Sequence, residues 1–216
     1  TESSSIRLLE HHIKARRPAW QAAAGGTFSD EVEQYELVKL RLLNGSHSLI
    51  SYLGGLSNSP TIPSARDKEF VAKSVHAAIY NEFLPSIELP HGFDADAYVA
   101  QLFHRWQNHA LGDKTARVGS DGSAKLLQRI HEPALRLLNM GQMPSEMALT
   151  AASWIACVAP PAGFDPGEIA AGMEEPQREN LAKATAGAKN THEHVEKIMT
   201  GGFFPTELGE HAEFTD

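Results

Sequence analysis

Four polar side chains recur at short intervals in the otherwise apolar stretch YELVKLRLLNGSHSLISYLGG: Glu36, Lys39, Asn44 and His47. An amine next to a carboxylate can transfer a proton, while a carboxamide and an imidazole can donate hydrogen bonds to one substrate oxygen. In such a site Lys39 would move the proton and Glu36 would steady or relay it. Asn44 and His47 would stabilise charge on the oxygen.

The stretch is predicted to form one helix. At about 100° per residue, with Lys39 at zero, Glu36 falls at about 60°, His47 at about 80° and Asn44 at about 140°, so all four share one arc. Leucines also lie among them, and a helix that is apolar nearly all round is normally buried. Burial would favour the neutral amine of Lys39. The same spacing also allows a partly exposed helix on which Lys39 extends to water and the polar residues are merely solvated.

Helical periodicity predominates in the rest of the chain and predicts one mainly α-helical domain, of the all-α class, with few strands. A short helix is expected over residues 4–14, and Ser29 or Asp30 is expected to cap the helix that carries the polar arc. Beyond Pro160 the sequence predicts loops and short helical turns. The other expected helices span residues 65–84, 95–111, 123–141 with an interruption near Pro133, 145–159 and 191–202.

Composition excludes several classes. The net charge of −8, from 19 basic and 27 acidic residues, argues against nucleic acid as a partner. No apolar run is long enough for a membrane span. The one cysteine, Cys157, is expected to be a buried hydrophobe in a reducing, cytoplasmic compartment. No glycine-rich nucleotide motif, H-E-x-x-H motif or cysteine cluster is present, and HEH at 192–194 reads as a solvated helix face rather than a metal site.

The pattern K-x-x-x-x-N-x-x-H, with YE before it and YLG after it, resembles the polyol-specific long-chain dehydrogenases, which include mannitol 2-dehydrogenases and mannonate oxidoreductases (fructuronate reductases). RRPAW at 16–20 is similar to a further family segment, although Arg16 replaces its usual glycine. ARVGSDGSAKLLQR at 116–129 is similar to a second family block. The resemblance covers roughly residues 10–158 of the sequence.

The resemblance implies roles for individual residues. Lys39 matches the catalytic general acid/base, Asn44 and His47 match residues that polarise the substrate oxygen, and Glu36 matches a proton path to the lysine. Arg117 and Lys125 match substrate-contacting positions. Lys39 then performs, without a metal, the task that zinc has in other alcohol dehydrogenases.

The resemblance also implies a domain organisation. Family enzymes join an N-terminal Rossmann domain, which binds NAD or NADP, to a helical substrate domain that resembles the C-terminal domain of 6-phosphogluconate dehydrogenase. Residues 1–216 are expected to be that C-terminal domain alone, without a Rossmann domain and inactive by itself. The expected substrate is a polyol or aldonate, of the mannitol/fructose or mannonate/fructuronate type, with a slight preference for mannonate. The alternatives are a non-catalytic helical module that binds a ligand or partner, and a relative that acts on a phosphorylated polyol.

Overall fold

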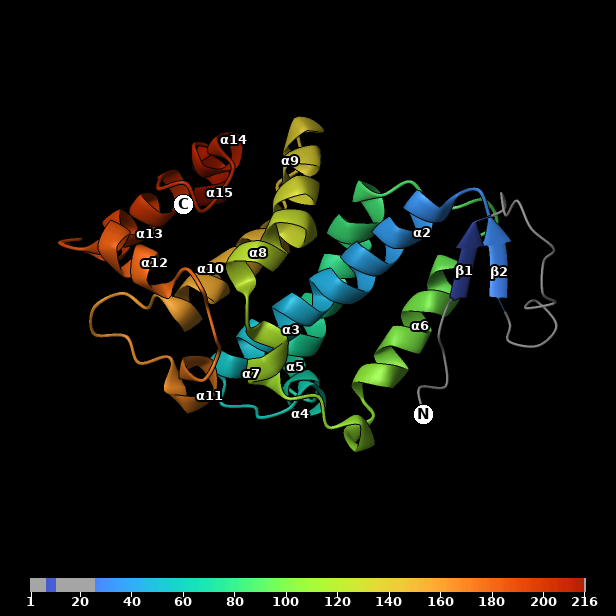
Figure 1. Ribbon diagram of the computed structural model, residues 1–216, viewed down its shortest axis with the longest axis horizontal. Coiled ribbons are helices and arrows are strands. Elements are labelled where there is room, and N and C mark those ends of the chain that lie inside the picture. The colour runs from blue at the N-terminus through green and yellow to red at the C-terminus, as the bar shows by residue number, and fades with distance from the viewer. Residues whose placement is uncertain (1–6, 11–25, 216) are drawn as a thin grey trace.

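A computed structural model of the chain describes residues 7–10 and 26–215, with side-chain surroundings from Ser29 onward. The described part is mainly helical, as predicted, with one two-stranded parallel sheet at one end (Figure 1). Strand β1 (Arg7–Glu10) pairs with β2 (Gly26–Ser29). The helix predicted over residues 4–14 is therefore wrong at β1, because a short apolar run does not distinguish a strand from a helix. The rest of that helix and the RRPAW segment lie outside the described residues.

Three consecutive elements form one continuous rod that carries the polar arc: α2 (Val32–Val38), the π-helix η1 (Lys39–Gly45) and α3 (Ser46–Leu56). The N-cap is Glu31, and its backbone N–H donates to the Ser29 hydroxyl at 3.0 Å. The predicted helix is thus present, and its middle turns are π-helical instead of α-helical. Figure 1 shows the rod running from the sheet towards the centre of the molecule.

The next helices pack against this rod. Thr61 and Ser64 form a capping box at the start of α4, so the helix expected over residues 65–84 begins earlier and is divided between α4 and α5. Asp94 caps α6 through the Ala97 N–H, so α6 begins at residue 95 as predicted and ends at Trp106, before the expected residue 111. The elements are α4 (Ile62–Arg66), α5 (Glu69–Ala77), the π-helix η2 (Ala78–Phe83), the 3-10 helix η3 (Leu84–Ser86), α6 (Ala95–Trp106) and the 3-10 turn η4 (His109–Leu111).

The second block of the resemblance, residues 116–129, folds into short elements joined end to end. Pro133 occupies the first turn of α9, which continues directly from η5, and its missing N–H removes one hydrogen bond to the preceding turn. The predicted interruption is therefore a change from π-helix to α-helix just before this proline. The elements are α7 (Thr115–Gly119), α8 (Gly122–Leu126), the π-helix η5 (Leu127–His131) and α9 (Glu132–Asn139).

The C-terminal third begins with α10 (Ser145–Val158), which starts at residue 145 as predicted. Short helices follow, and α13 ends at Thr200 with Gly201 as its C-cap, two residues before the expected end. HEH at 192–194 is not a wholly solvated face, because His194 is buried and its Nε2 lies 2.7 Å from the Ala159 carbonyl oxygen. The remaining elements are α11 (Gly167–Ala171), α12 (Arg178–Thr185), α13 (Thr191–Thr200), α14 (Thr206–Gly209) and α15 (Ala212–Thr215).

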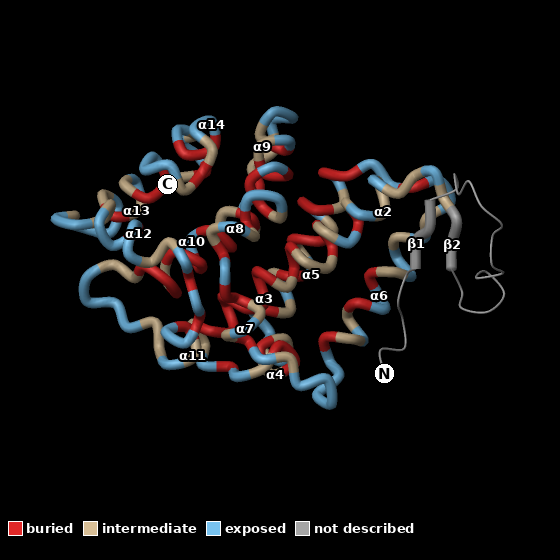
Figure 2. Tube along the Cα trace, viewed as in Figure 1, coloured by how far each residue is buried: buried red, intermediate tan, exposed pale blue. Residues whose placement is uncertain are grey.

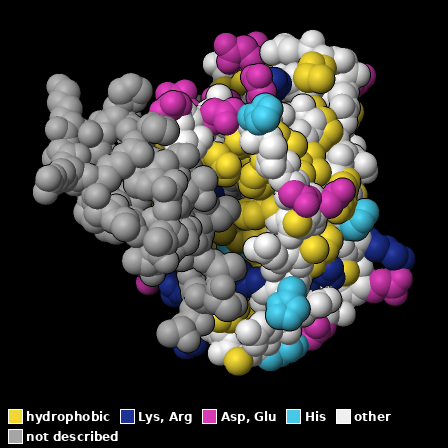
Figure 3. Space-filling view, turned by 90° about the vertical axis from the view of Figure 1, so that its right-hand side faces the viewer, with side chains coloured by type: hydrophobic (Ala, Val, Ile, Leu, Met, Phe, Trp, Pro, Cys, Tyr) yellow, Lys and Arg dark blue, Asp and Glu magenta, His cyan; other side chains and the backbone are white. Residues whose placement is uncertain are grey.

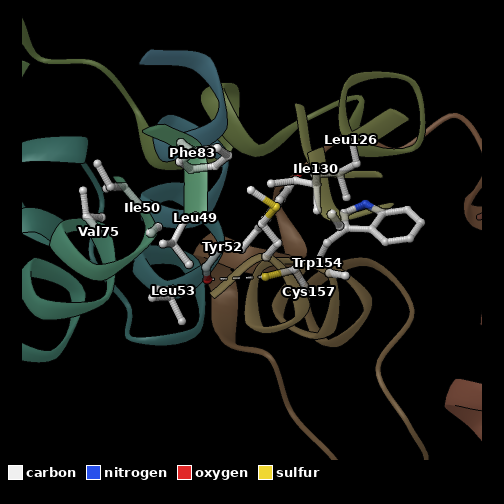
Figure 4. Close-up of a cluster of buried hydrophobic side chains, with 14 of the residues drawn as sticks. Leu49, Ile50, Tyr52, Leu53, Val75, Phe83, Leu126, Ile130, Trp154 and Cys157 are labelled. Atoms are coloured by element: carbon white, nitrogen blue, oxygen red, sulfur yellow. Dashed lines mark hydrogen bonds between the residues drawn. The ribbon is translucent and has the colours of Figure 1, made fainter. Parts of the chain in front are cut away.

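The core forms around α3, which is buried over most of its length (Figure 2). Leu49, Tyr52 and Leu53 of α3 meet Trp154 and Cys157 of α10 in the cluster drawn in Figure 4. The Cys157 thiol lies 3.6 Å from the Tyr52 carbonyl oxygen, and burial raises the pKa of this thiol to about 12. Cys157 is thus the buried, unreactive residue that the sequence predicted. Among the described residues, no helix has both the length and the apolar character to cross a membrane.

Candidate active site

The polar arc begins on the π-helical part of the rod. Hydrogen bonds in a π-helix join residues five apart, so Lys39 and Asn44 lie about one turn apart on the same side of η1. An α-helix would separate them by about 140° around the axis. His47 follows three residues later, in the first turn of α3. On the π-helix, the Lys39 amine and the Asn44 carboxamide therefore point in more similar directions than they would on the α-helix that the sequence analysis assumed.

Of the two arrangements that the spacing allowed for Lys39, burial or extension to water, the structure shows the second within this chain. Lys39 and Glu36 are both exposed, so the surrounding leucines do not bury the amine within this chain. The two side chains form no ion pair with each other in the part of the chain that the structure describes. The Asn44 side chain is half-buried, and its carboxamide likewise has no hydrogen-bond partner within the described ranges. The amine and the carboxamide are both available to a molecule from outside.

His47 is the most perturbed group of the arc. Its side chain is half-buried, and Nε2 is enclosed without a hydrogen-bond partner among the described residues. The ring lies 5.6 Å from that of Trp106. Burial, assisted by the positive charge of Arg105, lowers the pKa of His47 to about 4. The imidazole is therefore neutral at neutral pH, and a buried nitrogen without a partner is an energetic cost that a bound oxygen could relieve.

The structure places Arg117 and Lys125 on consecutive short helices, α7 and α8. Arg117 is exposed and donates to Asp113 at 3.0 Å. The half-buried Lys125 Nζ donates to the Ser120 carbonyl at 2.6 Å, at the end of α7, and burial with the nearby charge of Arg129 lowers the pKa of Lys125. Besides carrying a charge, Lys125 thus stabilises the turn between α7 and α8 through its hydrogen bond to the Ser120 carbonyl.

One cation that the sequence analysis did not single out joins the two motifs. Arg129, at the end of the second block, donates from Nη1 to the Asn44 carbonyl at 3.3 Å and to the Ser48 hydroxyl at 3.2 Å. Its charge acts on both His47 and Lys125. The contacts span 85 and 81 residues of sequence, so helical periodicity gave no sign of them. The only available signal was the presence of Arg129 in the block.

The chain beyond Pro160 supports the second block. The buried Glu175 carboxylate accepts hydrogen bonds from the Ser123 N–H at 3.0 Å and from Trp154 Nε1 at 3.2 Å. The Asp121 N–H donates to the Glu174 carbonyl at 2.8 Å. Since Asp121 and Ser123 flank the turn that leads to Lys125, this segment fixes the start of α8.

The face that carries the two strands is partly apolar. Figure 3 shows hydrophobic side chains gathered beside the grey atoms, with acidic and histidine side chains around them. Within the described residues no glycine-rich turn follows a strand and leads into a helix, which is how dinucleotide phosphates are held. The described residues therefore supply no cradle of this kind for the phosphates of a dinucleotide.

Comparison with known proteins agrees with the fold. The profile of the mannitol dehydrogenase C-terminal domain matches residues 31–215. The chain is 30% identical over 207 residues to a D-mannonate oxidoreductase of Escherichia coli (strain K12), covering 96% of this chain and 42% of that protein. It is 29% identical over 197 residues to mannitol 2-dehydrogenase of Aspergillus terreus, covering 89% of this chain and 38% of that protein.

A solved structure gives the same result. Pseudomonas fluorescens mannitol 2-dehydrogenase, in a ternary complex with NAD and D-mannitol, matches with a TM-score of 0.80 and 25% identity, covering 96% of this chain and 41% of that one. The helical domain is thus of the kind found in a sugar-alcohol dehydrogenase. The chain belongs to the mannitol dehydrogenase family through the C-terminal domain, which confirms the resemblance. It spans 42% of the length of the D-mannonate oxidoreductase.

Proposed function

We propose that this chain is the substrate domain of an NAD(P)-dependent oxidoreductase that interconverts a secondary alcohol of a polyol or aldonate and its ketone. The observation that carries the proposal is the enclosed, unpartnered Nε2 of His47 on the same rod as the available groups of Lys39 and Asn44. Membership of a family with mannitol and mannonate dehydrogenases supports the substrate class. The NAD complex of the Pseudomonas enzyme supports the cofactor.

In the proposed oxidation, the substrate hydroxyl lies against Lys39, and Lys39 Nζ takes the hydroxyl proton as the carbonyl bond forms. The C–H bond breaks with its electron pair, and the acceptor for that hydride would be a nicotinamide held by the cofactor domain. Asn44 and neutral His47 donate hydrogen bonds to the developing oxyanion. Reduction reverses each step. No metal is needed, because Lys39 handles the proton and the two donors handle the charge.

Glu36 would exchange the proton between Lys39 and solvent, which its exposed position one turn earlier on the rod permits. Arg117 and Lys125 would contact substrate hydroxyls or a carboxylate. Because Lys39 is exposed within this chain, we propose that a Rossmann domain outside these residues covers it and holds the cofactor. Exclusion of water would then favour the neutral amine in the assembled site.

The test is Lys39→Ala in the full-length gene product, assayed by NADH or NADPH consumption with fructuronate and fructose. General acid–base catalysis is worth about 10²–10⁴-fold, so kcat/KM should fall by at least about 100-fold. Lys73→Ala, an exposed lysine on α5, is the matched control and should retain activity. Activity of Lys39→Ala within a few-fold of the unsubstituted protein would show that the proposed role is wrong.

A panel of mannitol, mannonate, altronate and arabinitol would identify the substrate. We expect no turnover from the 216 residues alone. Turnover by that fragment would contradict the proposal that cofactor binding requires a second domain.

A further inference from the structure

Arg129 contacts the polar arc on both sides of His47. Its Nη1 lies 3.3 Å from the Asn44 carbonyl oxygen and 3.2 Å from the Ser48 hydroxyl, and that hydroxyl in turn lies 3.3 Å from the same carbonyl. These three groups form a closed hydrogen-bonded cluster. It encloses the segment of chain from Asn44 to Ser48, where η1 ends and α3 begins.

The cluster lies at a point where the backbone changes its hydrogen-bond pattern. Hydrogen bonds join residues five apart in a π-helix and four apart in an α-helix, so the carbonyl groups at the junction change partners. The Asn44 carbonyl is supported there by a charged donor, and charge-assisted hydrogen bonds are stronger than neutral ones. Asn44 and His47 lie on the two sides of this junction, so its geometry sets their relative direction.

Arg129 is held in place from its own side. It belongs to η5, which packs against η1, and its neighbour Ile130 is fully buried in the core cluster. The guanidinium remains charged at all relevant pH values. It is partly buried, and burial lowers its pKa from the ordinary arginine value. The Arg129 side chain is therefore held in one position by its surroundings, unlike a mobile cation on the surface.

We propose that Arg129 is a positioning residue, which clamps the Asn44 carbonyl and the Ser48 hydroxyl and so sets the direction in which the Asn44 carboxamide and the His47 imidazole meet the substrate oxygen. This inference rests on the proposed function. It assigns Arg129 no contact with substrate. It also explains why the two motifs are in contact: Arg129 of the second block stabilises the segment from Asn44 to Ser48 in the first.

The experiment uses Arg129→Ala and Arg129→Lys in the full-length protein, with Arg136→Ala, an exposed arginine on α9, as the control. Misplacement of donors by about 1 Å costs on the order of 100-fold, so we expect Arg129→Ala to lower kcat by about 10- to 100-fold with KM changed less than about threefold. Lysine keeps the charge but lacks the planar fork, so Arg129→Lys should restore part of kcat. A raised KM with unchanged kcat would overturn the inference, because it would indicate substrate binding.

A second measurement separates positioning from general destabilisation. In an Asn44→Ala, His47→Ala background, Arg129→Ala should lower kcat much less than in the unsubstituted protein, because the groups it positions are gone. An equal loss in both backgrounds, or a loss matched by the unfolded fraction in a thermal scan, would overturn the inference. Lys39→Ala is run in parallel. If that variant stays active, the proposed function fails; if it is inactive while Arg129→Ala is normal, only the Arg129 inference fails.

Discussion

Gly45 lies against the ring of Phe83. A Cβ atom built on Gly45 would come within 2.6 Å of Phe83 Cζ and 2.8 Å of Cε1. Gly45 is the last residue of the π-helix η1, and Phe83 is the last residue of the π-helix η2. The absence of a side chain at Gly45, the residue after Asn44, therefore allows the rod to approach η2 closely.

We predict that Gly45→Ala destabilises the protein by about 1–3 kcal/mol, because the added methyl overpacks the contact with Phe83. Chemical denaturation measures the loss. Phe83→Leu by itself should lower the free energy of unfolding. Combined with Gly45→Ala, it should remove much of the destabilisation that Gly45→Ala causes. Additive losses in the double variant would show that Phe83 is not what Gly45 accommodates.

A second prediction concerns Glu82, a buried carboxylate that accepts the N–H groups of Glu146 at 2.7 Å and Met147 at 2.8 Å and so caps α10. Burial raises the pKa of Glu82 to about 7 in spite of these bonds. Because the folded pKa lies above the unfolded one, its contribution to stability is greatest below about pH 4.5 and is lost as the pH rises towards 7. The difference in melting temperature between the unsubstituted protein and Glu82→Gln should therefore shrink from pH 5 to pH 8.

Glu88→Gln, which changes an exposed glutamate a few residues later, should show no such trend. If the difference between the unsubstituted protein and Glu82→Gln stayed constant over this range, Glu82 would not titrate there.

Glu175 gives a third prediction. Glu175→Ala would leave the Ser123 N–H, the Trp154 indole N–H and the Gln177 N–H without their carboxylate partner. Buried unsatisfied donors cost about 1–3 kcal/mol each, so we expect a loss of at least about 2 kcal/mol in the free energy of unfolding. Glu174→Ala, at the exposed neighbouring position, should have little effect. Equal stability of the two variants would argue against a supporting role for the C-terminal segment.

The sequence predicted those helices whose signals are local. Asp94 before α6, Pro144 before α10 and Gly201 after α13 are caps and breakers that act within a few residues, and each helix begins or ends beside them. Strand β1 was missed because its structure depends on pairing with β2, which no local pattern records.

The candidate site was predicted in composition but not in geometry. The K-x-x-x-x-N spacing was read on an α-helical wheel, whereas a spacing of five is the period of the π-helical hydrogen bond that the structure contains. The spacing left burial and exposure of Lys39 both open, because its apolar neighbours suggested burial while the helical wheel did not show which side of the helix meets the core. Arg129 and Glu175 were missed because they act across long sequence separations.

The last prediction concerns the protonation of His47. Its folded pKa, about 4, lies below the ordinary value of 6.5, so the neutral ring contributes stability that is present above about pH 6.5 and is lost as the pH falls towards 4. The cause is burial together with the charge of Arg105, and the proposed role as a neutral hydrogen-bond donor requires it. Histidine ring protons followed by NMR should show no titration of His47 between pH 5 and 8. His47→Asn should also lose less stability between pH 7 and pH 5 than the unsubstituted protein. A midpoint near pH 6.5 for His47 would mean that the ring is charged at the pH of catalysis for part of the population, and the assignment of a neutral donor would be wrong.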